Sequence, residues 1–402
     1  MAGGGPASLM LAAMYVLTVV GFPLFSTIPS ILRLDSQVAT VPYRVLVLGL
    51  SLAILYGWWV RGTRVCVNAA VLVTLALWVL LLARLLHDTV VNPLPGDLGI
   101  PVSQFILLSV GGCFLPALVF LQAPGDRTLD LARVWIEVLG ALAMIGILYV
   151  GLRGVFLGNV LYRLMTPVLN PISVGHLGVS VLLVTLCGLA GSKGVARVLR
   201  SALVALCVVV IVAPVSRGPI AAGVVGALLV TFYLRGRRRL GPGGVLLRLA
   251  LLAAAIVAVV QTVTFLEENG YIDFVARLSD TLQDVAAQER TAMILGAWRQ
   301  FTEHPLLGSS FVELRFMMNP HNIVLESLMA IGVVGLGLLL LSMSASLAAT
   351  WRLLRAGSRH ADREPHREAA AAVGGRGEGD RQEDPRQDHQ AHRLHRGGPR
   401  QV

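Results

Sequence analysis

Charged and aromatic residues are scarce in this chain. Only 14% of its 402 residues are charged and 6% are aromatic, whereas 55% are hydrophobic and the mean hydropathy is +0.73. About a quarter of the residues of an ordinary soluble domain are charged, so the composition excludes that class. Apolar runs recur over most of the length, which is typical of a helical protein that crosses a membrane many times.

Cysteine is also rare, and its placement excludes two kinds of site. The four cysteines lie inside apolar runs, where a thiol behaves as a small hydrophobe; they are Cys66, Cys113, Cys187 and Cys207. Because the sequence has no CxxC pair and no metal-ligand spacing, neither a disulfide framework nor a zinc site is expected. The N-terminus lacks a basic n-region and an A-x-A cleavage site, so residues 8–32 are predicted to be a retained span.

Ten apolar segments have about the length that a membrane crossing needs, roughly 20 residues. They lie at residues 8–32, 43–60, 65–86, 102–122, 131–152, 172–190, 198–215, 218–234, 245–265 and 322–350. The sequence therefore predicts an all-α polytopic membrane protein with about ten transmembrane helices, in a membrane-embedded part that covers residues 1–356.

Basic residues fall on one side of the membrane once these segments are threaded through it. They are Arg61, Arg64, Arg127, Arg133, Lys193, Arg197, Arg200, Arg235, Arg237, Arg238, Arg239, Arg352, Arg355 and Arg359. Basic loops stay in the cytoplasm, so the predicted outer segments are 33–42, 87–101, 153–171, 214–219 and 266–321. The net charge of +10 then reflects loops that contact anionic headgroups, and we expect no nucleic-acid partner.

The outer segment 266–320 is the only sizeable insertion between spans. Apolar residues recur in it at helical spacing, which predicts two short amphipathic helices on the outer mouth of the bundle. The first carries Phe274, Leu278, Leu282 and Val285, and the second carries Arg290, Ile294, Ala297, Trp298 and Phe301. Arg299 is nine residues from Arg290, about half a turn round, so only one of the two arginines can face the bundle.

The tail at 357–402 has a different composition from the rest. It holds five of the nine histidines, many charged residues, and no aromatic residue, Ile or Met. Such a composition predicts a disordered cytoplasmic tail, and a His-rich metal-binding tail is the less favoured alternative. With a single lysine in the whole chain, the tail also resembles out-of-frame translation of a GC-rich gene, so we expect a frameshifted or truncated C-terminus.

Ionisable residues gather near the predicted outer ends of the spans. Arg217 lies in the break Pro214–Pro219 between two spans, His176 lies just inside another, and His321 opens the last span with Glu326 about a turn and a half deeper. Polar groups at membrane depth are costly and usually functional or paired. Arginine clamps phosphate oxygens with its planar fork, and histidine can accept a proton near neutral pH. A lipid-diphosphate donor attacked by a sugar hydroxyl requires both.

Several motifs occur together in an order that resembles the O-antigen ligase and polymerase superfamily. They are NPI at 170–172, SRG at 216–218, ERTAMILGAWRQF at 289–301, HPLLG at 304–308 and HN at 321–322, which runs into an apolar helix. Each motif alone is weak, whereas their order and their common side of the membrane are specific. The resemblance covers about residues 1–350. Family members usually continue with one or two further spans, and none follows here.

The resemblance implies a membrane glycosyltransferase that moves a glycan from undecaprenyl diphosphate to an acceptor hydroxyl, with inversion and without metal or other cofactor. His321 would be the general base, with Glu326 orienting its imidazole. Arg217 and Arg290 would hold the departing diphosphate. The implied location is the bacterial inner membrane, with the active site facing the periplasm.

Weaker candidates remain for parts of this site. They are Arg277 and Arg163 for phosphate or acceptor contacts, His176 as a polar residue between helices, and Asp35 as a rival base. His304 is expected mainly to shape the turn before Pro305. The plain alternative for His321 and Arg217 is anchoring of span ends in the headgroup region.

The acceptor stays open, because a lipid A core, another lipid-linked glycan or a protein would need the same donor clamp. The rival functions are a flippase or other transporter of lipid-linked glycans, and an inactive, truncated member of the family. A transporter is expected to carry charges along a central path and inverted repeats, and neither is evident in the sequence.

Overall fold

The computed structural model describes residues 6–62, 67–91, 102–121, 126–156, 164–189, 191–214, 216–238, 285–320 and 322–374, together with the single positions 257, 261, 264 and 268. Within these residues the secondary structure is helical, apart from one isolated antiparallel bridge between Glu313 and Met318. The all-α class predicted from the sequence is confirmed.

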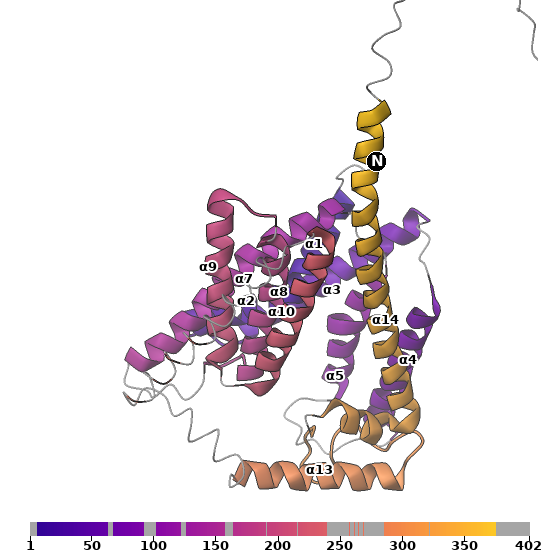
Figure 1. Cartoon of the computed structure of the whole chain (residues 1–402). Helices are drawn as coiled ribbons and strands as arrows, with labels where there is room; N and C mark the ends of the chain where they lie inside the picture. The colour runs from indigo at the N-terminus through magenta and orange to yellow at the C-terminus, as the bar shows by residue number, and fades with distance from the viewer. Residues whose placement is uncertain are drawn as a thin grey trace, which may run out of the picture.

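The helices are arranged as a bundle whose long members run side by side (Figure 1). In chain order the elements are α1 (Pro6–Val16), η1 (Leu17–Gly21), α2 (Phe22–Leu32), α3 (Gln37–Val60), α4 (Ala69–Val90), α5 (Val102–Ser109), η2 (Val110–Phe114), α6 (Leu115–Val119), α7 (Asp126–Phe156), α8 (Pro171–Leu189), α9 (Gly194–Val212), α10 (Arg217–Arg238), α13 (Val285–Glu303) and α14 (Ile323–Gly374).

Seven helices of the described part are long and apolar enough to cross a membrane, which confirms the polytopic prediction. They are Ala7–Leu32, Gln37–Val60, Ala69–Val90, Asp126–Gly154, Pro171–Leu189, Gly194–Val212 and Ile323–Ala348. Two shorter apolar helices, Ile106–Val119 and Gly218–Thr231, coincide with two further predicted spans. The tenth predicted span, at 245–265, lies outside the described residues apart from positions 257, 261 and 264.

The last helix extends further than predicted. α14 continues to Gly374, which is well inside the segment 357–402 that the composition predicts to be disordered. Alanine, arginine and glutamate are frequent there, and all three have high helix propensity, so local propensity favours helix where no core can form. The remaining tail, 375–402, lies outside the described residues.

The centre of the bundle is built around α8, which packs on α7, α9 and α10. Two glycines, one turn apart, allow this close packing. A Cβ atom on Gly178 would lie 2.8 Å from the side chain of Ile211 in α9, and one on Gly175 would lie 2.6 Å from Pro219 in α10. Small residues at such crossings let membrane helices approach, and here they bring the first turns of α8 and α10 together.

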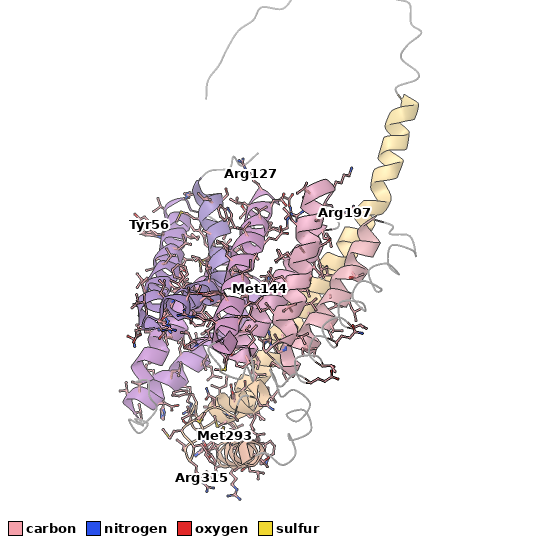
Figure 2. All side chains as sticks on the ribbon, turned by 90° about the vertical axis from the view of Figure 1, so that its left-hand side faces the viewer. Tyr56, Arg127, Met144, Arg197, Met293 and Arg315 are labelled. Atoms are coloured by element: carbon pink, nitrogen blue, oxygen red, sulfur yellow. The ribbon has the colours of Figure 1, made fainter. Side chains whose placement is uncertain are left out.

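The two ends of the bundle differ in the way that the threading predicts. Figure 2 shows Arg127 and Arg197 at one end and Met293 and Arg315 at the other, with Met144 between them. Arg127 and Arg197 belong to the predicted inner loops, and Met293 and Arg315 to the predicted outer segment. Hereafter the end with Arg315 is called the outer end.

A buried ion pair joins three helices at the opposite, inner end. The Nε of Arg200 in α9 lies 3.0 Å from both carboxylate oxygens of Glu137 in α7. Its guanidinium also donates to the hydroxyl of Ser192 and to the carbonyl of Gly188 in α8. Arg133, four residues before Glu137, pairs instead with the exposed Asp130 at 3.0 Å.

We expect Arg200→Gln to lower the free energy of unfolding by about 3 kcal/mol, because it leaves the carboxylate of Glu137 without its cation in a poorly solvated place. The matched control is Arg133→Gln, which breaks an exposed pair and should cost less than about 1 kcal/mol. Thermal unfolding of the detergent-solubilised variants measures both. An equal decrease in stability of the two variants would show that burial of the Glu137–Arg200 pair does not contribute to the free energy of unfolding.

Candidate functional site

The outer end is closed by α13, which lies crosswise to α14 and to the other long helices (Figure 1). Its buried residues are Met293, Ala297 and Gln300. Ala297 packs against Leu325 and Met329 of α14. The structure has a helix here, as predicted, whereas the helix predicted around 274–285 falls mostly outside the described residues.

The buried face of α13 is not the one that apolar spacing predicted. Ile294 and Trp298 were expected on it, yet they are 42% and 49% exposed. Ala297 is buried as expected because it packs on α14, whereas Met293 and Gln300 are buried where Ile294 and Phe301 were expected. Gln300 reaches the adjoining loop, where its Oε1 accepts from Leu314 N at 2.9 Å and its Nε2 donates to Val312 O at 3.3 Å.

The two arginines of α13 occupy different faces, as the spacing predicted. Position 290 precedes Met293 by three residues and Ala297 by seven, so by helical register it shares the face that packs on α14. Arg299 is exposed. It lines a cavity of about 330 Å³ between α13 and the following loop, together with Ala292, Leu295, Gly296, Gln300, Glu303, Glu313, Leu314 and Arg315. This cavity is therefore on a different face from position 290.

The last span is broken, although the sequence predicted one continuous helix at 322–350. Gly332 has φ 64° and ψ −164°, a conformation that is essentially restricted to glycine. The break leaves backbone donors and acceptors without helical partners. In a membrane each of these groups needs a partner inside the protein.

The HPLLG segment supplies those partners. Val333 N donates to Pro305 O at 2.9 Å, Val334 N donates to Leu306 O at 3.3 Å, and Ser309 N donates to Met329 O at 2.9 Å. Gly308, at φ 68°, completes the turn, and a Cβ atom there would collide with the backbone of Met329 and Ala330. Residues 305–309 thus cap the two half-helices of α14, which gives a structural reason for the glycine of the motif.

The HN motif marks the start of the outer half of α14. The Oδ1 of Asn322 accepts from Val324 N at 3.1 Å and from Leu325 N at 3.2 Å, so Asn322 is an N-cap residue. Glu326 is half-buried in the first turn, where a carboxylate also complements the helix dipole. His321, the predicted base, immediately precedes the cap and lies outside the described residues.

Two further motifs lie at the first turns of α8 and α10. Asn170 caps α8, since its Oδ1 accepts from Ser173 N at 2.7 Å, and Pro171 takes the first helical position that proline favours. Arg217 begins α10. The contact between Gly175 and Pro219 joins these turns, so the exposed His176 and the backbone of Arg217 belong to one part of the bundle.

The remaining candidates are less concentrated. Asp35 is exposed between α2 and α3, and its carboxylate accepts from Gln37 N at 2.7 Å, as an acid at a helix start commonly does. His304 is exposed, and its carbonyl accepts from Gly308 N at 3.0 Å, in line with the predicted turn-shaping role. Arg163 and Arg277 lie outside the described residues.

Sequence reasoning missed two residues that contact the end of HPLLG and the residues directly after it, up to Phe311. Arg84 donates to Ser309 O at 2.9 Å, and Asp88 accepts from Phe311 N at 3.0 Å. Asp88 was placed in the outer segment 87–101, yet α4 continues to Val90 and buries it. The available signal was an acid and a base four residues apart at the end of an apolar run.

Residues 202–340 match the family model described as O-antigen ligase. This supports the superfamily predicted from the order of the motifs, and the matched segment contains SRG, the α13 sequence, HPLLG and HN. Neither the comparison with curated proteins nor that with solved structures gave a match. The chain is therefore a multi-pass helical membrane protein, and its residues 202–340 are similar to the O-antigen ligase family.

We expect Gly332→Ala to destabilise the protein by about 3 kcal/mol or more, because alanine is strained at this φ and ψ and its Cβ would collide with Leu306 O. Gly337→Ala in the same helix is the matched control. A Cβ there meets no atom within 4 Å, so its effect should stay within about 1 kcal/mol. Thermal unfolding in detergent compares the two, and equal stability of both variants would contradict the break.

Proposed function

We propose that this chain is a glycosyltransferase that transfers a glycan from undecaprenyl diphosphate to an acceptor hydroxyl at the periplasmic face of the bacterial inner membrane. The observation that carries the proposal is that two motifs of the O-antigen ligase segment form one unit: HPLLG caps the break in α14, and HN begins the half-helix in front of that break. Discontinuous membrane helices commonly line sites that bind polar or charged groups.

In the proposed reaction, His321 takes the proton of the acceptor hydroxyl as its oxygen attacks the anomeric carbon. The new C–O bond forms as the bond from that carbon to the diphosphate breaks, with inversion. Glu326, in the turn that follows, would orient the imidazole. No metal is needed in this proposal, because fixed cations take over the stabilisation of the leaving group.

Arg217 and Arg290 are the proposed cations. The register of α13 supports Arg290, since its position shares the face with Met293 and Ala297 that packs on α14. Arg217 is supported by its place at the first residue of α10, which packs on both α8 and α14. Preorganised charges that meet a developing anion usually contribute most to such catalysis.

The acceptor distinguishes two forms of the proposal. A ligase would use a lipid A core, and a polymerase would use a second lipid-linked glycan; a protein acceptor is a third form. All three share the donor clamp and the base. His176, Arg163, Arg277 and Asp35 are secondary candidates for acceptor or phosphate contacts.

The first test is expression of the chain in one strain that lacks its O-antigen ligase and in another that lacks its polymerase. We expect capping of lipid A in the first strain or glycan ladders in the second, and we expect His321→Ala to abolish them while the protein still inserts. Gel analysis of the glycans measures both. Activity that survives His321→Ala would remove the proposed base, and no activity with proper insertion would favour an inactive family member.

The second test compares the two arginines of α13. Arg290→Ala should reduce transfer at least about 100-fold, the usual loss when a stabilising group for a developing charge is removed. Arg299→Ala, whose side chain is on the cavity side, should leave transfer within about threefold, because a surface charge away from the reacting atoms contributes less than 1 kcal/mol. Initial rates in proteoliposomes, normalised to inserted protein, give the comparison. A similar loss in both variants would contradict the assignment by helix face.

A further inference from the structure

The outer end of α4 carries two charged side chains that face the protein interior. Arg84 and Asp88 are one turn apart, and their side chains are 13% and 1% exposed. They lie in the last two turns of a helix that is mostly apolar from Ala69 onward. Charged groups at this depth are costly unless they are paired, so their partners indicate what they do.

Arg84 binds three consecutive carbonyl groups of the HPLLG turn. Its guanidinium nitrogens donate to Leu307 O, Gly308 O and Ser309 O, each at 2.9 Å. The planar guanidinium presents several donors in a fixed fork, which a lysine ammonium does not. Arg84 therefore fixes both the position and the orientation of this turn.

Asp88 holds the same segment two residues later. Its Oδ2 accepts from Phe311 N at 3.0 Å, and its Oδ1 lies 3.4 Å from Arg84 and 3.3 Å from the Nδ1 of His87. The carboxylate thus neutralises Arg84 and anchors the chain at Phe311. Phe311 in turn packs with Leu85 and with Ile331 of α14 in one apolar cluster.

The turn held by α4 is the turn that caps the break in α14. Pro305 O and Leu306 O satisfy the first amides after Gly332, and Ser309 N satisfies Met329 O before it. The contacts continue from Arg84 and Asp88 through residues 305–311 to the outer half of α14, at whose start Asn322 follows His321. A hydrogen bond of 2.7 Å between the hydroxyls of Thr74 and Ser342 also joins α4 to α14, on the other side of the break.

We infer that Arg84 and Asp88 are positioning residues for glycan transfer: they hold the 305–311 turn against the break in α14 and so orient the half-helix whose N-cap, Asn322, directly follows the proposed base, His321. This inference rests on the proposed function. Neither side chain has to touch the substrate. Catalytic geometry tolerates errors of only about half an ångström, so a loosened turn lowers the rate of the chemical step more than it weakens donor binding.

The experiment measures transfer kinetics in proteoliposomes with an undecaprenyl-diphosphate-linked glycan donor. For Arg84→Gln and Asp88→Asn we expect kcat, per folded protein, to fall roughly tenfold to a hundredfold, the range expected when a reacting group shifts by about an ångström. The KM for the donor should change less than about threefold, because Arg217 and Arg290 are intact. Arg84→Lys, which keeps the charge but not the fork, should recover part of the loss.

A structural control separates positioning from simple loss of stability. Arg200→Gln removes a buried pair at the inner end, and it should lower thermal stability while kcat per folded protein stays unchanged. Hydrogen exchange gives a second readout. Peptides that cover residues 305–311 and 329–335 should exchange faster in Arg84→Gln, and they should keep their protection in Arg200→Gln.

The outcomes distinguish the inference from the proposed function. If the wild type transfers glycan and kcat is undiminished in Arg84→Gln and Asp88→Asn, the inference is overturned. The proposed function is then unaffected. The inference is also overturned if kcat per folded protein falls equally in Arg84→Gln, Asp88→Asn and Arg200→Gln, since the loss is then a general effect of destabilisation. Absence of transfer by the wild type overturns both. If Arg84→Gln does not accumulate, Arg84→Lys and Asp88→Asn provide the same comparison.

Discussion

The hydrogen bonds across the break in α14 are the interactions on which the outer end depends. A helix in a membrane cannot leave backbone groups without partners, and the unwound step at Gly332 exposes several. The chain satisfies them with its own preceding turn, through Pro305, Leu306 and Ser309. That requirement fixes the position of the turn at residues 305–309. The turn then fixes the position of the outer half of α14. The HPLLG and HN motifs are thus two parts of one structural unit.

The bundle holds this unit from two sides. On one side Ala297 of α13 packs against α14, and Gln300 bonds the loop that follows. On the other side α4 supplies Arg84 and Asp88. At the inner end, a separate ion pair between Glu137 and Arg200 holds α7 and α9 together. The pair at the inner end makes no contact with this unit in the described residues, so a variant there changes stability without touching the outer-end contacts.

The proposed function depends on the residues that lie beside the HPLLG turn and the outer half of α14. Arginine at position 290 shares the face of α13 that packs on α14, whereas Arg299 belongs to the cavity side. Asn322 sets the first turn directly after His321. In the proposed reaction, a base and cations beside a membrane surface would suit a lipid-linked diphosphate donor, since its phosphates stay at the headgroup level while its sugars extend into water.

The sequence alone determined the all-α polytopic class, the positions of the seven helices that are long enough to span a membrane, the separation of Arg290 from Arg299 by half a turn, and the resemblance to O-antigen ligases. These follow from hydrophobicity and helical period, which are local properties. The break at Gly332, the buried stripe of α13 and the roles of Arg84 and Asp88 were decided by tertiary structure. A glycine inside an apolar run is common in membrane helices, so it carries no local sign of a break. Asp88 sits at a span end, where burial depends on whether a distant turn folds over it.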